Sequence, residues 1–582
     1  MLFFWPKKCC GNLFIIITKL QRNYVEITPF LLYIYPVYIK TTKSKAHIYV
    51  QLVRGFREGS KVKHEVLVNL GRLDQLQKDT SWGGIVDKLS ELMDLKNIFN
   101  MDKCHSTQIS NWGYLVYKKL WGKFKLDQVL LSIQKNGNAT FDLNNACFLM
   151  VIRHLLEPGS KLNTYNKQKK YLQYQEVELN HLYRSLDVLH QNKEKIEQHI
   201  FSINCSLFKM KVDIAFYDVT TFHFESVRKD GLKNFGYSKN CKFNEVQVVL
   251  GMFIDCEGRP IGYELFSGNT FDSKTLDQAL DAIEKRFGIR NVIIVADRGI
   301  NSKINLKHIV DKGYGYIVSS RIKNMSEKTQ KEIFDNAGYA KLYGDDHSIS
   351  YKILDYANTC KAGKDKFKLS EKLIITYSEK RAHKDCADRQ RLLDKANHLL
   401  ANKALIKGSG KRGGKKYLKE QGENIDWILD AEAITKDEKF DGYYGIQTSD
   451  ANLSVEKILD AYHTLWKIEE SFRIMKSTLE VRPIFHWTED RIKGHFVACF
   501  LAFLLERTME VELHSAGIVA STQDIRDVIN AMQFTETECK GKKYLLSAPT
   551  PELGLKILST LKLKLPPNSM PAEQFSSEKF VA

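Results

Sequence analysis

The chain has 582 residues, 43% hydrophobic and 27% charged, which excludes a disordered low-complexity polymer and allows three or four domains with at least one large core. The 87 Lys and Arg residues exceed the 69 Asp and Glu residues, giving a net charge of +18 that favours a polyanionic partner. The eleven cysteines are scattered and never spaced as CxxC, so we predict reduced thiols in a cytoplasmic protein, without a disulfide framework or a zinc site.

Residues 1–36 mix aromatic and apolar runs with scattered charges. Their apolar runs are far shorter than the roughly 20 residues that span a bilayer, and no small-residue cleavage site follows an apolar core. We therefore expect neither a membrane segment nor a signal peptide. We interpret this stretch as a doubtful extension outside the working protein, whose natural start would lie near Val37, where a strand is plausible.

Residues 37–205 are predicted to form an N-terminal region that is a candidate for DNA binding. Between 46 and 71, HIYVQLVRGF and KHEVLVNLG alternate in polarity around REGSKV, which predicts a small basic β-hairpin. The rest of the region reads as mostly helical. The expected helical segments are Leu73–Ile98, Asn111–Ile133, Leu143–Leu156 and Glu178–Phe201.

Residues 206–320 are predicted to form the first part of an α/β catalytic core. The expected strands and helices follow the order βββαβαβ, which is typical of an RNase H-like sheet. The strands are 212–218, 245–253, 260–266, 291–296 and 314–319, and the helices are 273–287 and about 301–312. Asp218 ends the first strand and Asp297 follows the fourth, and in this topology those strands are parallel neighbours about 5 Å apart. We therefore expect the two carboxylates to lie close together.

Residues 321–448 are predicted to be a β-rich insertion, with strands at 348–354, 372–377, 427–434 and 440–448 and a charged helix over 380–405. Residues 449–510 are predicted to complete the core with a glutamate-bearing helix and a buried apolar helix over 491–506. Residues 511–582 are expected to be a helical region with a frayed tail from about Leu565.

The helix expected over 462–476 carries the third candidate carboxylate. Tyr462, Glu469 and Lys476 are seven residues apart, almost two turns, and so share one stripe that Arg473 joins. Glu470 competes with Glu469, but adjacent helical positions point about 100° apart. A solvated face of an ordinary amphipathic helix is the alternative interpretation. Two aspartates and one glutamate supply the hard oxygen ligands that Mg²⁺ prefers, and two such ions can activate the attacking oxygen and stabilise the leaving oxygen in phosphoryl transfer.

Three blocks of sequence resemble bacterial insertion-sequence transposases of the DDE superfamily, specifically the insertion-sequence-4-like group. The blocks are YDVTTFHFE around Asp218, VADRGINS around Asp297, and YHTLWKIEESFRIMKSTLEVRPIFHWTEDRIKGHF around Glu469. The resemblance implies an RNase H-like core with an insertion domain, and two Mg²⁺ or Mn²⁺ ions per active site. It also implies cut-and-paste transposition of an element with terminal inverted repeats, a homodimer in the synaptic complex, and a cytoplasmic, nucleoid-associated enzyme.

By position, Asp218, Asp297 and Glu469 match the metal-binding triad of that group. Its signature on the glutamate helix is Tyr, two residues, Arg, three residues, Glu, six residues, Lys, and Leu465 stands at the arginine position. The resemblance implies that the signature residues grip DNA phosphates. The candidate DNA contacts are Tyr462, Arg473, Lys476, Arg298 and Trp487.

Each candidate DNA contact has a structural alternative. Arg473 could supply the charge missing at Leu465, while Arg298 could equally form a structural salt bridge. Trp487 could stack on an extruded base, although a core position is the more ordinary role for tryptophan. Two other functions stay open on the same fold: a nuclease or resolvase that cuts without joining, and an inactive relic or repressor that binds the element ends.

Overall fold

The computed structural model describes residues 37–581 except 59–60, 80, 94–104, 208–209, 211, 237–243, 290–291, 298, 300, 343–348, 363–364, 407, 409–412, 422–425, 451, 482–483, 485 and 540. The interpretation of residues 1–36 therefore lies outside the described residues. The chain forms two compact units, Met1–Cys104 and His105–Ala582. Their boundary falls inside the range 37–205 that the sequence suggested as one region, because the helices after residue 114 pack onto the core of the second unit.

The first unit contains a three-stranded antiparallel sheet made of β1 (Val37–Ser44), β2 (His47–Glu58) and β3 (Lys61–Arg72). The predicted hairpin is confirmed as β2 and β3, and β1 adds a third strand that begins at Val37. In place of one long helix, the chain then forms α2 (Leu73–Leu76) and α3 (Ser81–Leu92).

The second unit begins with a strand, β4 (His105–Asn111), that we did not predict. It pairs with β16 (Gln533–Cys539) in a four-stranded sheet completed by β17 (Lys542–Ser547) and β18 (Ser569–Pro571). The expectation of a frayed C-terminal tail is wrong, because Phe575 and Phe580 pack against the core residues Phe534 and Trp112. The remaining C-terminal elements are α18 (Thr522–Ala531), α19 (Glu552–Thr560), η7 (Ala572–Gln574) and α20 (Ser577–Val581).

The helices of residues 115–207 are α4 (Leu115–Lys123), α5 (Leu126–Asn136), α6 (Leu143–Leu156), α7 (Lys161–Lys167), η2 (Gln168–Lys170), α8 (Leu179–Gln191) and α9 (Lys193–Leu207). Among them, α4, α6 and α8 contact one long helix of the core, α17 (Glu489–Ser515), and the others pack on neighbouring elements. The boundaries predicted for α6 are confirmed, and its N-cap Asp142 accepts a hydrogen bond from the Asn145 backbone. Two predicted helices are each divided, at Lys125 with φ +50° and at Asn192.

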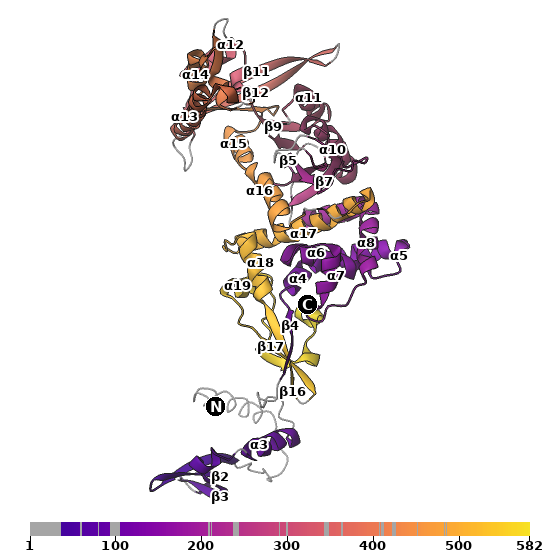
Figure 1. The fold of residues 1–582 in the computed structure, drawn as a ribbon, viewed down its shortest axis with the longest axis vertical. Helices are drawn as coiled ribbons and strands as arrows, with labels where there is room; N and C mark the ends of the chain where they lie inside the picture. The colour runs from indigo at the N-terminus through magenta and orange to yellow at the C-terminus, as the bar shows by residue number, and fades with distance from the viewer. Residues whose placement is uncertain are drawn as a thin grey trace, which may run out of the picture. The chain divides into compact units, whose positions relative to one another are not determined.

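The catalytic sheet has the strand order predicted for an RNase H-like core. The strands β5 (Ile214–His223), β6 (Gln247–Ile254) and β7 (Pro260–Ser267) form an antiparallel meander, and β8 (Ile293–Ala296) and β9 (Gly315–Ser319) run parallel to β5. Their order is β7-β6-β5-β8-β9. α10 (Asp272–Phe287) and α11 (Lys303–Asp311) share a buried cluster with one face of the sheet and are drawn beside it in Figure 1. Among the described residues, no helix combines the length and apolarity needed to cross a membrane.

The insertion continues the catalytic sheet instead of standing apart from it. β10 (Ala340–Lys341), β11 (Ile349–Ala362), β12 (Asp365–Ser378) and β15 (Tyr443–Thr448) add four strands beyond β9. The predicted strand over 427–434 is wrong in its second half, because β14 (Asp426–Leu429) stops where Asp430 caps α14 (Ala431–Glu438). The remaining elements are η3 (Ile322–Asn324), α12 (Glu327–Phe334), α13 (Glu379–Ala401), η4 (Lys403–Leu405), η5 (Gly414–Tyr417) and β13 (Leu418–Gln421).

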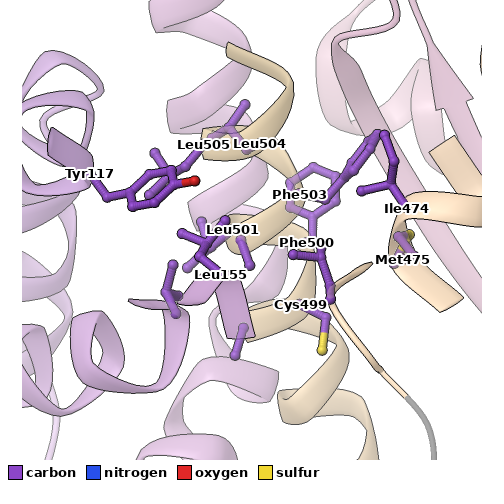
Figure 2. Close-up of a cluster of buried hydrophobic side chains, with 14 of the residues drawn as sticks. Tyr117, Leu155, Ile474, Met475, Cys499, Phe500, Leu501, Phe503, Leu504 and Leu505 are labelled. Atoms are coloured by element: carbon purple, nitrogen blue, oxygen red, sulfur yellow. The ribbon is translucent and has the colours of Figure 1, made fainter. Parts of the chain in front are cut away.

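α17 is the buried centre of the second unit. Leu155 of α6 lies on one side of it, and Ile474 and Met475, which follow the glutamate helix, lie on the other (Figure 2). Gly494 allows this packing, since a Cβ there would stand 1.9 Å from the backbone oxygen of Leu186 on α8. Through α17 one core joins the N-terminal helices to the elements that carry the candidate site.

Burial on α17 also makes stability depend on pH. Burial raises the pKa of Glu506 to about 8 from the ordinary 4.5, and that of Glu510 to about 7. Between the ordinary and the folded pKa values the folded state keeps protons that the unfolded state has lost. The contribution of the two glutamates to the free energy of unfolding is therefore greatest below about pH 4.5 and is lost as pH rises through the folded pKa.

We therefore predict that Glu506→Gln weakens this pH dependence. The Tyr117 hydroxyl, which donates to Glu506 Oε2 at 2.7 Å, can still donate to the amide oxygen. The wild type should lose on the order of 1 kcal/mol per pH unit per retained proton, and the variant should lose less. Urea midpoints measured between about pH 5 and about pH 9 test this. Equal slopes in the two proteins would contradict it.

Candidate active site

Asp218 and Asp297 occupy the same face of the catalytic sheet. On β5, Phe216 and Phe222 belong to the core cluster that contains α17, whereas Tyr217 belongs to the cluster on the opposite face. On β8, Val295 belongs to the α17 cluster. Side chains alternate along a strand, so Asp218 shares the face of Phe216, and Asp297, two residues after Val295, continues that same face.

The two aspartates are also adjacent in register. β5 and β8 pair in parallel with Tyr217 opposite Ala296, so the next pair along the two strands is Asp218 and Asp297. Neighbouring strands lie about 4.8 Å apart. Asp218 is half-buried, and its Oδ1 accepts the Val219 backbone N–H at 2.8 Å, whereas Asp297 is exposed. This matches the predicted adjacency, with one correction. β5 does not end at Asp218 but continues to His223, because β-branched and aromatic residues follow it.

The glutamate segment crosses this face as a broken helix. α15 (Val455–His463) leads through a turn at Thr464 and Leu465 into α16 (Trp466–Arg473), and η6 (Ile474–Thr478) continues as a π-helix. At the turn, the Lys467 and Ile468 backbone N–H groups bond to the residues three positions earlier instead of four. The expected single helix over 462–476 is therefore wrong. α15 contacts β9, and α16, which carries Glu469, contacts β5; both helices are labelled in Figure 1.

Tyr462 contacts the sheet beside Asp297. Its hydroxyl lies 2.6 Å from that of Tyr444, which in turn donates to Ser319 Oγ at 2.8 Å. In register, Ala296 pairs with Val318, which brings Ser319 next to Asp297. Burial, followed by the hydrogen bond to Tyr444, raises the pKa of Tyr462 well above its ordinary value. Tyr462 therefore stays protonated at neutral pH.

Lys476 contacts the sheet beside Asp218. Its Nζ donates to Oγ1 of Thr220, two residues along β5, and lies 5.7 Å from the centre of the Phe222 ring. Asp218, Thr220 and Phe222 share one face of the strand. A cation thus lies on the same strand face as the first carboxylate.

Glu469 and its neighbour Glu470 have different surroundings. Glu469 is exposed and makes no hydrogen bond or ion pair with any described residue. Glu470 accepts from both Nη atoms of the buried Arg507 at 3.3 Å, and Arg473 pairs with Glu470 at 3.4 Å. Arg473 therefore pairs with Glu470 and not with Glu469, although the sequence placed it on the same helix stripe as Glu469. The carboxylate available for a ligand on this helix is that of Glu469.

The chemistry of these carboxylates fits a hard divalent cation, because they offer only oxygen donors and two of the three are exposed. They do not form a single compact group: among the described residues, the only three metal-ligating side chains with all ligand atoms within 4.8 Å are His154, His495 and Cys499. The three carboxylates therefore lie on adjacent elements, but their oxygen atoms are not all close enough to one another to form a preassembled metal site.

Leu465, at the signature arginine position, is only 9% exposed and belongs to the α17 core cluster. We therefore expect Leu465→Arg to lower stability by at least about 2 kcal/mol instead of restoring a phosphate contact, since a buried cation without a partner is costly. Denaturant midpoints and DNA-end affinity should be measured together. A variant as stable as the wild type that binds DNA more tightly would refute the burial argument.

Two further candidates have different outcomes. Arg298 lies outside the described residues. Trp487 is 70% exposed, so its interpretation as a core residue is wrong. Its backbone oxygen accepts from Lys233 Nζ at 3.0 Å, and that ammonium lies 6.0 Å from the indole ring. An exposed indole is available for stacking.

A cleft of about 660 Å³ opens beside Asp297, and no sequence pattern predicts it. Tyr462 and Tyr444 line it together with basic residues from the first turns of α13. Lys380 and Lys384 are exposed and pair with no carboxylate among the described residues, while the Arg381 guanidinium lies 4.2 Å from the centre of the Tyr444 ring. The insertion thus supplies positive charge at the edge of the carboxylate site.

Comparison with protein families gives two matches. The family described as transposase DDE domain matches residues 211–505, just over half of the chain. The family described as IS1634 family transposase, N-terminal domain, matches residues 38–96. The first range includes all three carboxylates, and the second lies within the first unit. No curated protein matches the chain.

Solved structures give distant similarities. The piggyBac transposase synaptic complex with hairpin DNA is 9% identical over 73% of this chain and 82% of that chain, with a TM-score of 0.34. The Mos1 transposase paired-end complex with the left transposon end is 12% identical over 31% of this chain and 60% of that chain, with a TM-score of 0.14. The strand order of the sheet, and not these similarities, establishes the RNase H-like core.

Proposed function

The chain belongs to the transposase DDE domain family and is an insertion-sequence transposase, and on this premise we propose that Asp218, Asp297 and Glu469 are its catalytic residues. What supports the proposal is that Asp218 and Asp297 directly follow the last register pair of β5 and β8, and that α16, which contacts β5, carries a Glu469 that pairs with no described residue. Membership of the insertion-sequence-4-like group stays a prediction.

We propose that the three carboxylates hold two divalent ions, Mg²⁺ or Mn²⁺. When bound, such ions lower the pKa of an attacking water or 3′-hydroxyl and neutralise charge on the phosphate. The protein must hold the carboxylates ionised and the DNA in place. The sheet would fix the two aspartates, and the ion pair of Glu470 with Arg507 would hold α16 in place and leave the Glu469 carboxylate to bind an ion.

The DNA partners we propose are the terminal inverted repeats of the element and its target. Lys476 on one side and the cleft with Lys380, Lys384 and Tyr462 on the other would position the phosphates on either side of the carboxylates. The net charge of +18 supports a nucleic-acid partner. Trp487 would stack on an extruded base. We also propose that the protein acts as a homodimer in the synaptic complex and that it is located in the cytoplasm, in association with the nucleoid.

The test is cleavage of a labelled duplex that carries the flanking inverted repeat, with Mg²⁺ or Mn²⁺, followed by strand transfer into a supercoiled target. Nicking at the repeat end and joining of the liberated 3′-OH are expected. Cutting without joining would favour the nuclease or resolvase alternative. Specific end binding without cutting would identify an inactive relic or a repressor, and would refute the catalytic proposal.

The basic cleft should contribute to DNA binding in a salt-dependent way. Lys384→Ala is expected to weaken binding of the element end and to reduce the slope of log K against log salt by about 1. Lys135→Ala, an exposed lysine of α5 that does not line the cleft, is the matched control. Fluorescence anisotropy over a salt series measures both. Identical slopes for wild type and Lys384→Ala would remove the cleft from the binding surface.

A further inference from the structure

A second cluster of metal-ligating residues lies buried in the core, where α6 and α17 meet. His154 of α6 is 3% exposed, and His495 and Cys499 of α17 are 5% and 0% exposed. Among the described residues, these three form the only group whose ligand atoms all lie within 4.8 Å of one another. Figure 2 shows Cys499 on α17, one residue before Phe500. Two imidazoles and one thiol are the ligand types that zinc prefers.

The distances within this cluster approach those of a zinc site. Cys499 Sγ lies 3.9 Å from Nε2 of His154, and it lies 4.0 Å from Nδ1 and 3.5 Å from Nε2 of His495. Zinc bonds of about 2.3 Å to sulfur and about 2.0–2.1 Å to nitrogen give tetrahedral sulfur–nitrogen edges of about 3.5 Å. The distances from Cys499 Sγ to His154 Nε2 and to His495 Nδ1 therefore exceed a tetrahedral edge by only about 0.5 Å.

Backbone carbonyl groups already select the nitrogen atoms that would face an ion. His154 Nδ1 lies 3.1 Å from the Leu479 oxygen, and His495 Nε2 lies 3.1 Å from the Val481 oxygen. Each of these nitrogens donates to its carbonyl, which leaves the lone pair on His154 Nε2 and on His495 Nδ1. Such carbonyl partners are the usual outer shell of zinc-bound histidine. His495 Nε2 is nearer than Nδ1 to Cys499 Sγ, so the His495 ring has to turn for Nδ1 to share an ion with the sulfur.

Two neighbours complete the surroundings. The His486 ring, 7% exposed, lies 5.2 Å from that of His495 and is the candidate fourth ligand. Lys161 Nζ lies 3.5 Å from His154 Nε2, where it competes with an ion. No carboxylate pairs with Lys161 among the described residues.

We propose that His154, His495 and Cys499 bind one Zn²⁺ ion at a structural site, with His486 as the fourth ligand and release of the Cys499 thiol proton. The ion would join α6 to α17 and fix the segment containing Leu479 and Val481, which directly follows the π-helix of Lys476. This site is separate from the carboxylate site, takes a softer metal, and does not depend on the catalytic proposal.

The experiment measures metal content of the full chain, expressed with zinc and dialysed without chelator, by inductively coupled plasma mass spectrometry. About one zinc per chain is expected. Cys499→Ser and His495→Asn should each lose it. Cys147→Ser is the matched control, since Cys147 is also fully buried and its thiol pKa is also raised to about 12 by burial, yet it is outside the group. Asp297→Asn should keep the zinc, which separates this site from the carboxylates.

Cobalt substitution tests the same site without relying on activity or on a variant that folds poorly. The Co²⁺ protein should show a thiolate-to-cobalt charge-transfer band that Cys147→Ser retains and Cys499→Ser lacks. Chelation of the wild type should lower its unfolding temperature, because an ion that binds only the folded state stabilises it. A wild-type chain that carries no zinc, gives no such band with excess Co²⁺ and unfolds identically with and without chelator would overturn the proposal.

Discussion

Glu469→Gln is expected to reduce cleavage at the element end by about 10³-fold while end binding is retained. The amide keeps the size of the side chain but removes the charge that holds a divalent ion. Charge stabilisation by such an ion contributes several kcal/mol to the transition state, and each 1.36 kcal/mol is a factor of ten in rate. Because Glu469 is exposed and pairs with no described residue, its loss should leave stability unchanged. Single-turnover cleavage and anisotropy measure the two effects separately.

Glu470→Gln is the control, because it makes the same chemical change one position along the helix. It weakens the ion pair with Arg507, so stability should fall by about 1–3 kcal/mol while the cleavage rate stays within a few-fold of wild type. Arg507 keeps a second partner, Glu510, at 2.8 Å. If Glu470→Gln abolished cleavage and Glu469→Gln did not, the assignment of the third carboxylate would be reversed.

Gly494→Ala is expected to have the largest effect on stability, a loss of about 3 kcal/mol or more. The new Cβ would lie 1.9 Å from the Leu186 oxygen and 2.5 Å from its carbonyl carbon. Both atoms belong to the backbone of α8 and cannot rotate away, so the two helices must separate. Separation would loosen the core around α17, and chemical denaturation followed by circular dichroism should show the loss.

Gly122→Ala on α4 is the matched substitution, since a Cβ there would meet nothing within 4 Å. Alanine favours helix over glycine by up to about 1 kcal/mol, so this variant should be as stable as the wild type or slightly more stable. Opposite signs at the two glycines would show that contact with α8, and not helix propensity, controls the outcome. Equal effects at both would count against the packing argument.

Periodicity predicted the core of the fold because the signal is local. An apolar run followed by an acidic residue identified β8 and Asp297, and the strand order follows from the sequence of strands and helices. The predicted end of β5 at Asp218 is wrong. Asp218 interrupts the apolar pattern, but the backbone pairing of β5 with β6 continues past it. The helix of Glu469 was expected to be continuous, since no Gly or Pro marks the turn at Thr464 and Leu465. Tertiary packing of Leu465 sets that turn.

Features that depend on contacts between distant segments could not be predicted. Three such features are the Tyr462–Tyr444 contact, the cleft beside Asp297 and the pairing of β4 with β16. In each case the local sequence pattern does not indicate which distant segment will be contacted. The absence of CxxC suggested that no zinc site exists, yet His495 and Cys499 are four residues apart on one helix face. That spacing was a usable signal, whereas the contribution of His154 requires the fold.

The pairing of β4 with β16 has a consequence for synthesis of the protein. Thr107 bonds to the Glu536 backbone across 429 positions of the chain, so the sheet that contains β4 cannot form until nearly the whole polypeptide has left the ribosome. The apolar faces of the helices of residues 115–207 likewise stay exposed until α17 has been synthesised and packs against this core. Prematurely terminated chains would keep a strand edge and apolar helices open, and would be cleared or would aggregate before reaching DNA. Only a completely translated chain can therefore fold into a protein that is able to act on DNA.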